Sequence, residues 1–216
     1  MNKKGMILII SGPSGVGKGT LLNNLVKNSK GDMSYSLSAT TRECREGEAE
    51  GVTYYYKTEE EFDRLIESGD VLEYDTYSNH RYGTLKSVLR KALDEGKSIA
   101  LDITVPGAVA VKSAFKDEAV SVFIMPPSIE ELEKRLIERG REDINEIYRR
   151  IAFAIESEMS KFNEFDYVVT NDVLEGAVGR LEHILESEFN KSSRNSDILE
   201  NMNVDSYLRK YKSEGV

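Results

Sequence analysis

A glycine-rich loop near the start of the chain constrains the fold more than any other feature. An apolar, β-branched run at residues 7–10 stops at a loop, residues 12–18, that holds three glycines, and a helix-compatible segment follows at 20–27. Glycines allow unusual dihedral angles and close backbone approach, so successive N–H groups can point at a phosphate beside the positive end of a helix. Lys18 adds a mobile positive charge for a phosphoryl group in transfer. The order strand, loop, helix therefore predicts a nucleotide site.

The loop departs from the phosphate-loop motif Gly-x4-Gly-Lys-[Ser/Thr] at one position. It matches from Gly12 to Lys18, but Gly19 stands where the motif has the hydroxyl that usually contacts Mg²⁺. Thr20 supplies a hydroxyl one residue later. The alternative is a glycine-rich strand-to-helix turn that carries a lysine by chance, and the order of the three elements argues against it.

Composition and charge exclude several classes of protein. The chain has 216 residues, 39% of them hydrophobic, which suits one domain with insertions. No apolar run approaches the roughly 18 residues of a membrane span, and the run after the two N-terminal lysines is too short for a signal peptide. A single cysteine, Cys44, allows no internal disulfide and predicts the reducing cytoplasm as the location. The net charge of −9 argues against general nucleic-acid binding, so clustered arginines carry information.

Further apolar strands and intervening helices predict an α/β fold with a parallel sheet. The strands are expected at residues 98–103, 120–125 and 165–169, and the helices at 107–115 and 174–189. Asp102 lies near the carboxyl end of the first of these strands. Ligands bind at that edge of open α/β sheets, which places Asp102 near the phosphate loop.

The stretch from residue 36 to about 93 lacks the long buried strands of a parallel sheet, so we expect an insertion there. A capping box that begins at Thr58 predicts a helix over the residues that follow. We expect a turn at residues 82–84, with Thr84 capping the next helix at 85–93.

Two groups of arginines are candidates for binding phosphate. Arg42 and Arg45 stand beside Tyr54 and could hold a phosphate by bidentate and hydroxyl hydrogen bonds, or they could belong to a solvated loop. Arg135 and Arg139 share one face of a capped helix, which could equally be a surface helix stabilised by salt bridges. A phosphate-transfer enzyme needs mobile arginines there to neutralise the transferring group and exclude water. Three more arginines follow within a dozen residues: Arg141, Arg149 and Arg150.

Residues 190–216 form a polar tail in which Lys, Ser, Asn and Asp dominate. A segment of this composition buries little apolar surface. We expect a weakly ordered tail with one helix around residues 205–212.

Several motifs in register resemble the guanylate kinase family over residues 5–189. The most specific is Ser38-Ala39-Thr40-Thr41-Arg42-x-x-Arg45-x-Gly47-Glu48-x-x-Gly51-x-x-Tyr54, and the others are the phosphate loop and the segments 82–84 and 165–172. The resemblance implies a P-loop NTPase-type three-layer parallel sheet, the CORE, with an inserted α+β GMP-binding domain and a helical LID. It places the CORE at about 5–35, 95–125 and 165–189, the insertion at about 36–93 and the LID at about 126–160, within a domain of residues 1–189.

The resemblance also implies a transferase reaction of purine metabolism, in which ATP and GMP give ADP and GDP with Mg²⁺ as cofactor. It implies that Lys18, Arg42, Arg139 and Arg150 are catalytic. The ATP contacts that it implies are Gly12, Pro13, Ser14, Gly15, Val16, Gly17, Lys18, Gly19, Thr20, Arg135, Arg139 and Asn171. The GMP contacts that it implies are Ser38, Arg42, Arg45, Tyr54, Glu73, Tyr82, Thr84 and Asp102. We expect no nucleic-acid or membrane partner, and a monomer or a homodimer.

Two positions depart from the family pattern on the guanine side. The family usually has a second guanine-reading acid where this chain has Thr104, and a glutamine where it has Pro106. Glu73 still suits guanine, whose N1–H and N2–H donors adenine lacks. Losing one charged acceptor would cost about 1–3 kcal/mol, roughly 5- to 150-fold in discrimination.

The sequence Gly-Lys-Gly-Thr is similar to that of adenylate kinase, another nucleoside monophosphate kinase. This similarity implies that Mg²⁺ is held largely by waters and substrate phosphates, with Asp102 supporting it through water.

Two other functions remain open at this point. A related kinase could phosphorylate another nucleoside monophosphate or a phosphorylated sugar, which Thr104 and Pro106 motivate. An inactive guanylate-kinase-like interaction module is the other, and the complete loop from Gly12 to Lys18 argues against it. ATP binding would separate the inactive module from the two kinases.

Overall fold

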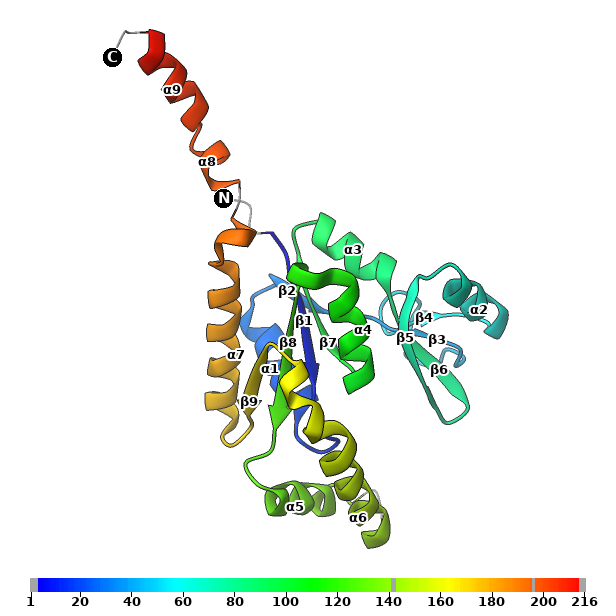
Figure 1. The fold of residues 1–216 in the computed structure, drawn as a ribbon. Helices are drawn as coiled ribbons and strands as arrows, with labels where there is room; N and C mark the ends of the chain where they lie inside the picture. The colour runs from blue at the N-terminus through cyan, green and yellow to red at the C-terminus, as the bar shows by residue number, and fades with distance from the viewer. Residues whose placement is uncertain (1–3, 141–142, 196, 214–216) are drawn as a thin grey trace.

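A five-stranded parallel sheet forms the centre of the computed structural model, which describes residues 4–140, 143–195 and 197–213 (Figure 1). Arg141, which the sequence groups with the LID arginines, lies outside the described residues. Neighbouring strands pair in parallel in the order β2-β7-β1-β8-β9. The strands are β1 (Ile7–Ser11), β2 (Met33–Tyr35), β7 (Ser98–Asp102), β8 (Ala119–Met125) and β9 (Tyr167–Thr170).

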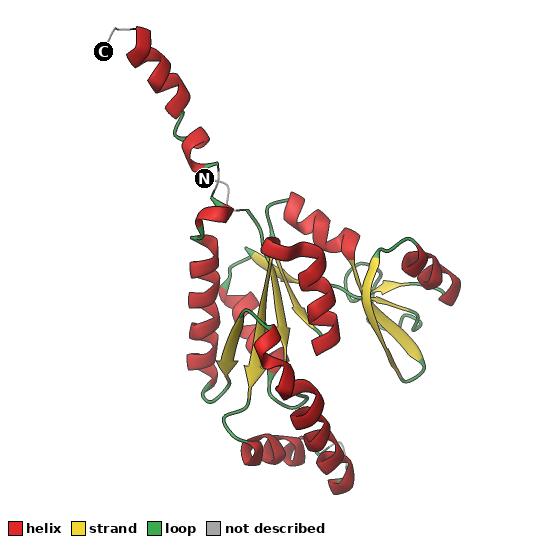
Figure 2. Cartoon of the chain, in the orientation of Figure 1, coloured by secondary structure: helices red, strands yellow, loops and turns green. Residues whose placement is uncertain are grey.

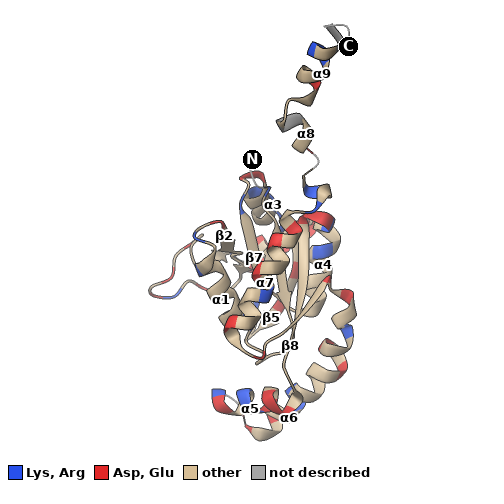
Figure 3. Cartoon of the chain, turned by 90° about the vertical axis from the view of Figure 1, so that its left-hand side faces the viewer, with Lys and Arg blue, Asp and Glu red and all other residues tan. Residues whose placement is uncertain are grey.

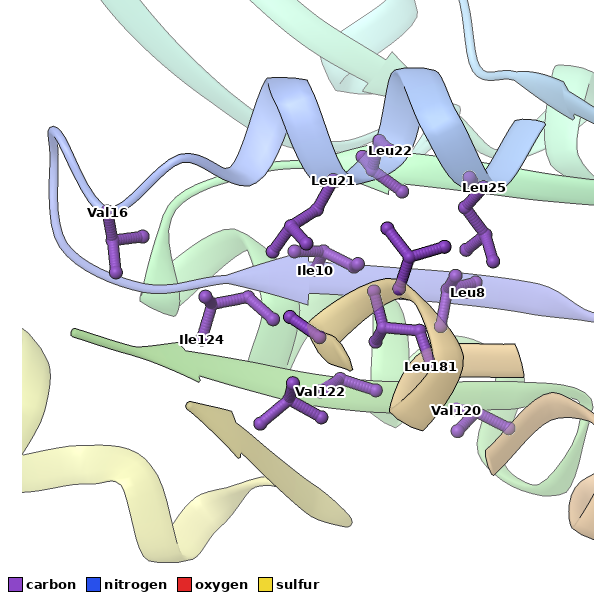
Figure 4. Close-up of a cluster of buried hydrophobic side chains, with 14 of the residues drawn as sticks. Leu8, Ile10, Val16, Leu21, Leu22, Leu25, Val120, Val122, Ile124 and Leu181 are labelled. Atoms are coloured by element: carbon purple, nitrogen blue, oxygen red, sulfur yellow. The ribbon is translucent and has the colours of Figure 1, made fainter. Parts of the chain in front are cut away.

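The alternation of side chains along β1 produces the three layers. Leu8 and Ile10 face one side and pack with the helices α1 (Lys18–Asn28) and α7 (Leu174–Phe189), as Figure 4 shows. Ile7 and Ile9 face the other side and pack with α3 (Lys86–Asp94) and α4 (Val105–Phe115). Successive residues of a strand point to opposite faces, so a continuous apolar strand needs helices on both sides. The predicted α/β class and three-layer sheet are confirmed.

The edge strand β2 was not anticipated from the sequence. Residues 28–34 are mostly polar and follow the helix expected at 20–27, yet Met33–Tyr35 pair with β7. Of these three residues only Met33 is buried. A three-residue edge strand carries too few apolar residues to show a period of two, and its pairing partner lies far away in sequence.

A second sheet of four strands, ordered β4-β3-β6-β5, stands beside the first (Figure 2). Its strands are β3 (Ala39–Thr40), β4 (Tyr55–Tyr56), β5 (Val71–Tyr77) and β6 (His80–Leu85). The helix α2 (Glu59–Glu67) covers it through Phe62, which is fully buried against Ala39 and Leu85. The capping box predicted at Thr58 is confirmed, because its side chain and that of Glu61 bond reciprocally to backbone N–H groups.

The turn predicted at residues 82–84 is wrong. These residues lie inside β6, antiparallel to β5, and the chain reverses instead at Ser78 and Asn79, whose φ angles are 51° and 64°. Thr84 does not cap the next helix; Leu85 occupies that position without a side-chain cap. Gly83 suggested a turn, but a Cβ there would come within 2.9 Å of the carbonyl oxygen of Glu73. Close approach of a neighbouring strand, rather than a turn, requires this glycine.

The predicted insertion and the central layers meet at α3. Leu89 of α3 belongs to the core of the central sheet, while Val88 also packs against the cluster beneath the second sheet. The second sheet itself therefore ends at Leu85, and α3 connects the two sheets.

Two helices, α5 (Ile129–Arg139) and α6 (Ile144–Phe153), lie beyond the carboxyl edge of the central sheet and carry both basic and acidic side chains (Figures 1 and 3). A π-helical turn, Ala154–Glu158, and a 3-10 helix, Met159–Glu164, lead from α6 back to β9.

The tail continues past α7 as α8 (Ile198–Asn201) and α9 (Val204–Ser213), which point away from the body of the molecule (Figure 1). The single tail helix predicted around 205–212 corresponds to α9, and α8 was not anticipated. Among the described residues, no helix is both long and apolar enough to cross a membrane.

Candidate active site

The phosphate loop connects β1 to α1 in a conformation that only glycine adopts easily. Gly12, Gly15 and Gly17 have φ angles of 143°, 88° and 97°. A Cβ at Gly12 would also come within 2.4 Å of the carbonyl oxygen of Ile124 on β8. Gly17 begins α1 without a side-chain cap, so the free N–H groups of the first turn and the helix dipole are available to an anion.

Lys18 folds back over this loop. Its Nζ donates to the carbonyl oxygens of Gly12 at 2.7 Å and Pro13 at 3.2 Å, and lies 3.9 Å from Oδ1 of Asp102. Burial raises the pKa of Asp102, and the charge of Lys18 works against that rise. The predicted proximity of Asp102 to the loop is confirmed.

Two cavities meet at the loop. The first, of about 610 Å³, lies outside the loop and has among its lining residues Gly15, Gly17, Gly19, Thr20, Arg135 and Arg139. The second, of about 320 Å³, faces the second sheet and has among its lining residues Ser38, Glu73, Asp75, Tyr82, Thr104 and Glu158. Ser14, Lys18 and Asp102 line both cavities, so one lysine lies between two spaces that can each hold a ligand.

Arg135 and Asn171 hold the loop from behind. The Arg135 guanidinium donates to the carbonyl oxygens of Val16 at 3.4 Å and Asn171 at 3.1 Å, and pairs with Glu131. The buried amide of Asn171 donates to the Val16 carbonyl at 2.8 Å. These bonds support the backbone of the loop, in addition to the first cavity that Arg135 lines.

Glu73 lines the second cavity from β5. Its Oε1 accepts a 2.6 Å hydrogen bond from Oγ1 of Thr84, its partner across the β5–β6 pair. Gly107 in the first turn of α4 lies close enough that a Cβ there would be 2.8 Å from Oε2 of Glu73. Burial raises the pKa of Glu73, with the Thr84 hydrogen bond working against it. The second cavity therefore contains a carboxylate that is partly shielded from water.

Arg42 packs against two tyrosine rings at the edge of the second sheet. Its guanidinium is 5.4 Å from the ring centroid of Tyr54 and 5.9 Å from that of Tyr56. Two hydrogen bonds of 2.8 and 2.9 Å join it to the carboxylate of Glu48. These bonds lower the pKa of Glu48 to about 2. Burial and a hydrogen bond to Glu48 raise the pKa of Tyr56 to about 12.

The remaining predicted residues have different surroundings. Tyr82 packs edge-on against Tyr54 with centroids 5.8 Å apart. The side chain of Arg45 is exposed, and its backbone N–H donates to Glu48 at 2.9 Å. Arg150, on α6, donates to Oγ of Ser14 at 3.3 Å, which connects the helical pair α5–α6 to the loop.

Comparisons with known proteins agree with this geometry. The family model described as guanylate kinase matches residues 4–188. The guanylate kinase of Oceanobacillus iheyensis is 42% identical over 194 residues, covering 90% of this chain and 93% of that one. That of Enterococcus faecalis is 43% identical over 188 residues, covering 87% and 91%. This chain belongs to the guanylate kinase family.

Solved structures extend this result to the fold. The crystal structure of guanylate kinase from Anaplasma phagocytophilum has a TM-score of 0.68 and 32% identity, covering 92% of this chain and 95% of that one. Shikimate kinase from Bacteroides thetaiotaomicron, at 16% identity and a TM-score of 0.50, shares the fold alone.

Three acidic residues of this guanylate kinase family member were missed as site residues. Glu48 pairs with Arg42, and Asp75 and Glu158 line the second cavity. Glu158 ends a π-helical turn, which no local pattern marks, and burial raises its pKa while Lys18 works against that rise. Asp75 could have been found, because it stands two residues after Glu73 on a strand and so shares its face.

The described residues contain no group of three His, Cys, Asp or Glu side chains that could hold a metal ion. A magnesium ion held by substrate phosphates and waters fits this donor set, because such ions commonly keep several waters and few protein ligands. Asp102, beside Lys18 on the wall shared by the two cavities, is placed to bond those waters.

Proposed function

We propose that this chain transfers the γ-phosphoryl group of ATP to the phosphate of GMP, giving ADP and GDP. The observation behind the proposal is the wall that the two cavities share. Lys18 lies in this wall, between the space outside the phosphate loop and the space that Glu73 lines. A donor on one side and an acceptor on the other would meet at the Lys18 ammonium.

ATP occupies the first cavity, with its phosphates on the loop from Gly12 to Thr20. The backbone N–H groups and the start of α1 bind the β-phosphate region. Arg139 lines this cavity and neutralises phosphate charge, while Arg135 and Asn171 hold the loop in shape. Arg150, in contact with Ser14, reaches the transferring group when the LID closes.

GMP occupies the second cavity. Glu73, held by Thr84, accepts the N1–H and N2–H groups of guanine, and Ser38 borders the base. The phosphate lies toward Arg42, Arg45, Tyr54 and Tyr82. Because Glu48 already engages the terminal nitrogens of Arg42, Glu48 orients this guanidinium, and a phosphate must share it.

The transfer requires no covalent enzyme intermediate. A phosphate oxygen of GMP attacks the γ-phosphorus in line; a new oxygen–phosphorus bond forms as the bond to the bridging β-oxygen breaks, and ADP leaves with that electron pair. The attacking phosphate is already ionised, so no general base is needed. Lys18 follows the transferring group and the arginines stabilise its charge. Closure excludes water, which would otherwise take the phosphoryl group.

A magnesium ion on the ATP phosphates would supply charge neutralisation. Asp102, on the wall shared by the two cavities, would hold the waters of that ion. Four points stay predictions: a cytoplasmic location, a monomeric or homodimeric state, the absence of nucleic-acid and membrane partners, and the division into CORE, GMP-binding and LID parts.

The test is a coupled ADP-release assay with ATP, Mg²⁺ and a panel of acceptors: GMP, dGMP, IMP, AMP, CMP and UMP. We expect GMP to be preferred over AMP by at least about 100-fold, because a buried carboxylate facing adenine would lack its N–H partners. Reactions without acceptor measure hydrolysis of ATP by water. If ATP binds but no nucleotide accepts phosphate, the proposal fails and the acceptor belongs to another class.

A further inference from the structure

Four carboxylates line the second cavity, and they fall into two pairs: Asp102 with Glu158, and Glu73 with Asp75. The first pair lies toward the phosphate loop, where both members are affected by the charge of Lys18. The second pair lies on β5, and within the part of the chain that the structure describes neither member forms a salt bridge. A ligand that covers the second pair must therefore bring donors of its own.

Glu73 and Asp75 share one face of β5. They stand two residues apart on the strand and pair across the sheet with Thr84 and Tyr82. Side chains two residues apart on a strand point to the same side, and both line the cavity. The two carboxylates influence each other, because the charge of Asp75 contributes to the raised pKa of Glu73.

Each of the two carboxylates uses one oxygen in a hydrogen bond within the protein. Oε1 of Glu73 accepts from Thr84 at 2.6 Å. Oδ1 of Asp75 accepts from the backbone N–H of Thr76 at 2.7 Å. Oδ2 of Asp75 accepts no hydrogen bond from any residue in the part of the chain that the structure describes.

Guanine presents one more donor than Glu73 alone can accept. Its N1–H and one hydrogen of the 2-amino group fit the two oxygens of a single carboxylate, and the second amino hydrogen needs another acceptor. Thr104, on the same cavity, is occupied in capping α4, where its Oγ1 accepts from the N–H of Gly107 at 3.4 Å. A neutral hydroxyl is also a weaker acceptor than a carboxylate for such a donor.

We propose that Asp75 is a specificity-determining residue that accepts the second hydrogen of the guanine 2-amino group, beside Glu73 and in place of a carboxylate at Thr104. This inference rests on the proposed function. An acceptor at Asp75 distinguishes GMP from IMP, which has the same O6 and N1–H but lacks the 2-amino group. Asp75 takes no part in phosphoryl transfer, so its removal changes acceptor choice rather than the chemical step.

The test compares kcat/KM for GMP and IMP in the full chain and in Asp75→Ala, Asp75→Asn and Asp117→Asn. Asp117 is an exposed acid on another surface and controls for the loss of one negative charge. We expect Asp75→Ala to lower kcat/KM for GMP by roughly 10- to 100-fold and to leave IMP unchanged, since a charged hydrogen bond is lost only with GMP. For Asp75→Asn, which keeps one acceptor oxygen, kcat/KM for GMP should lie between the values for the unaltered protein and for Asp75→Ala. Asp117→Asn should match the unaltered protein.

A second variant relocates the carboxylate. Thr104→Asp in the Asp75→Ala background should restore the preference for GMP over IMP, because aspartate caps a helix as well as threonine does and lines the same cavity from α4. A purely structural role for Asp75 would not be rescued from position 104.

Four outcomes overturn the inference. Equal losses with GMP and IMP would place Asp75 at the ribose or the phosphate, and a loss that disappears with dGMP would assign it to a ribose hydroxyl. No loss with either nucleotide would show that Asp75 makes no contact with the base. If the unaltered protein phosphorylates neither nucleotide while binding ATP, the proposed function itself fails, and this inference fails with it.

Discussion

The donor and acceptor sides of the site are built in different ways. The donor side is one continuous segment, the phosphate loop between β1 and α1, on the innermost strand of the central sheet. The acceptor side collects residues from β5, β6, the residue before β3 and the N-cap of α4, which only the folded chain brings together. The first is set by local backbone geometry, and the second by pairing between distant segments. Changes on the donor side should affect the chemical step, and changes on the acceptor side should affect recognition.

The largest expected effect comes from Lys18→Met. Removing the ammonium that lies between the two cavities should lower kcat by about 100- to 1000-fold, as loss of one charge-stabilising group at a transition state does. The KM for GMP should change little, because the acceptor contacts come from other elements. Steady-state kinetics with both substrates measure this directly.

Lys27→Met is the matched control for this variant, since Lys27 is an exposed lysine on the same helix. It should retain full activity. A fall in kcat of less than about 10-fold for Lys18→Met would remove Lys18 from the chemical step and make the two sides of the site more alike than we infer.

A smaller effect, confined to the acceptor side, is expected for Gly107→Ala. The added Cβ would lie 2.8 Å from Oε2 of Glu73 and 3.0 Å from two of its carbons, so the carboxylate must move. Displacement of a recognition group should raise the KM for GMP roughly 10-fold and leave the KM for ATP unchanged. The helix should not be weakened, because alanine is favoured over glycine there by about 0.5–1 kcal/mol.

Gly179→Ala in α7 serves as the control, because a Cβ at that position meets no heavy atom within 4 Å. It should change neither KM. Equal increases in both KM values for Gly107→Ala would mean that α4 positions the two sides together, contrary to the comparison.

The smallest effect is on stability and its dependence on pH. Burial raises the pKa of Glu73 in the folded protein, so ionisation of Glu73 opposes folding. Its unfavourable contribution is absent below the ordinary glutamate pKa of about 4.3 and grows as the pH rises through the raised folded pKa. Glu73→Gln should therefore gain stability relative to the unaltered protein at neutral pH and lose that gain in acid, as measured by urea unfolding from acid to neutral pH.

Asp166 provides the opposite case within the central layers. Burial works against its charge, but hydrogen bonds from Lys112 and Ser121 hold its pKa below the usual value. Its stabilising contribution is present above the unfolded pKa and is lost as the pH falls through the folded pKa. Asp166→Asn should be destabilised at neutral pH, with the difference fading in acid. If the stability differences of the two variants changed with pH in the same direction, the contrast between Glu73, whose ionisation opposes folding, and Asp166, whose ionisation favours it, would be contradicted.

The two sides also differ in how far the sequence predicts them. The conformation of Gly12–Lys18 follows from residues that are neighbours in the chain, so the motif predicts strand, loop and helix together. The position of Asp102 near the loop is predicted equally well, because the carboxyl ends of parallel strands lie at the same edge of the sheet as the loop. The turn predicted at 82–84 is wrong and β2 was missed, since pairing with β5 and with β7 decides these two strands.

By itself the sequence determined the α/β class with a parallel sheet, the capping box at Thr58 and the phosphate loop. These depend on periodicity, glycine dihedral angles and capping, all of which act within a few residues. Only the tertiary structure decided that Glu158 reaches the cavity beside Lys18 and that Thr104 faces the same space as Glu73. Such contacts join residues from separate elements, and their energies exist only after the chain has closed the loops between them.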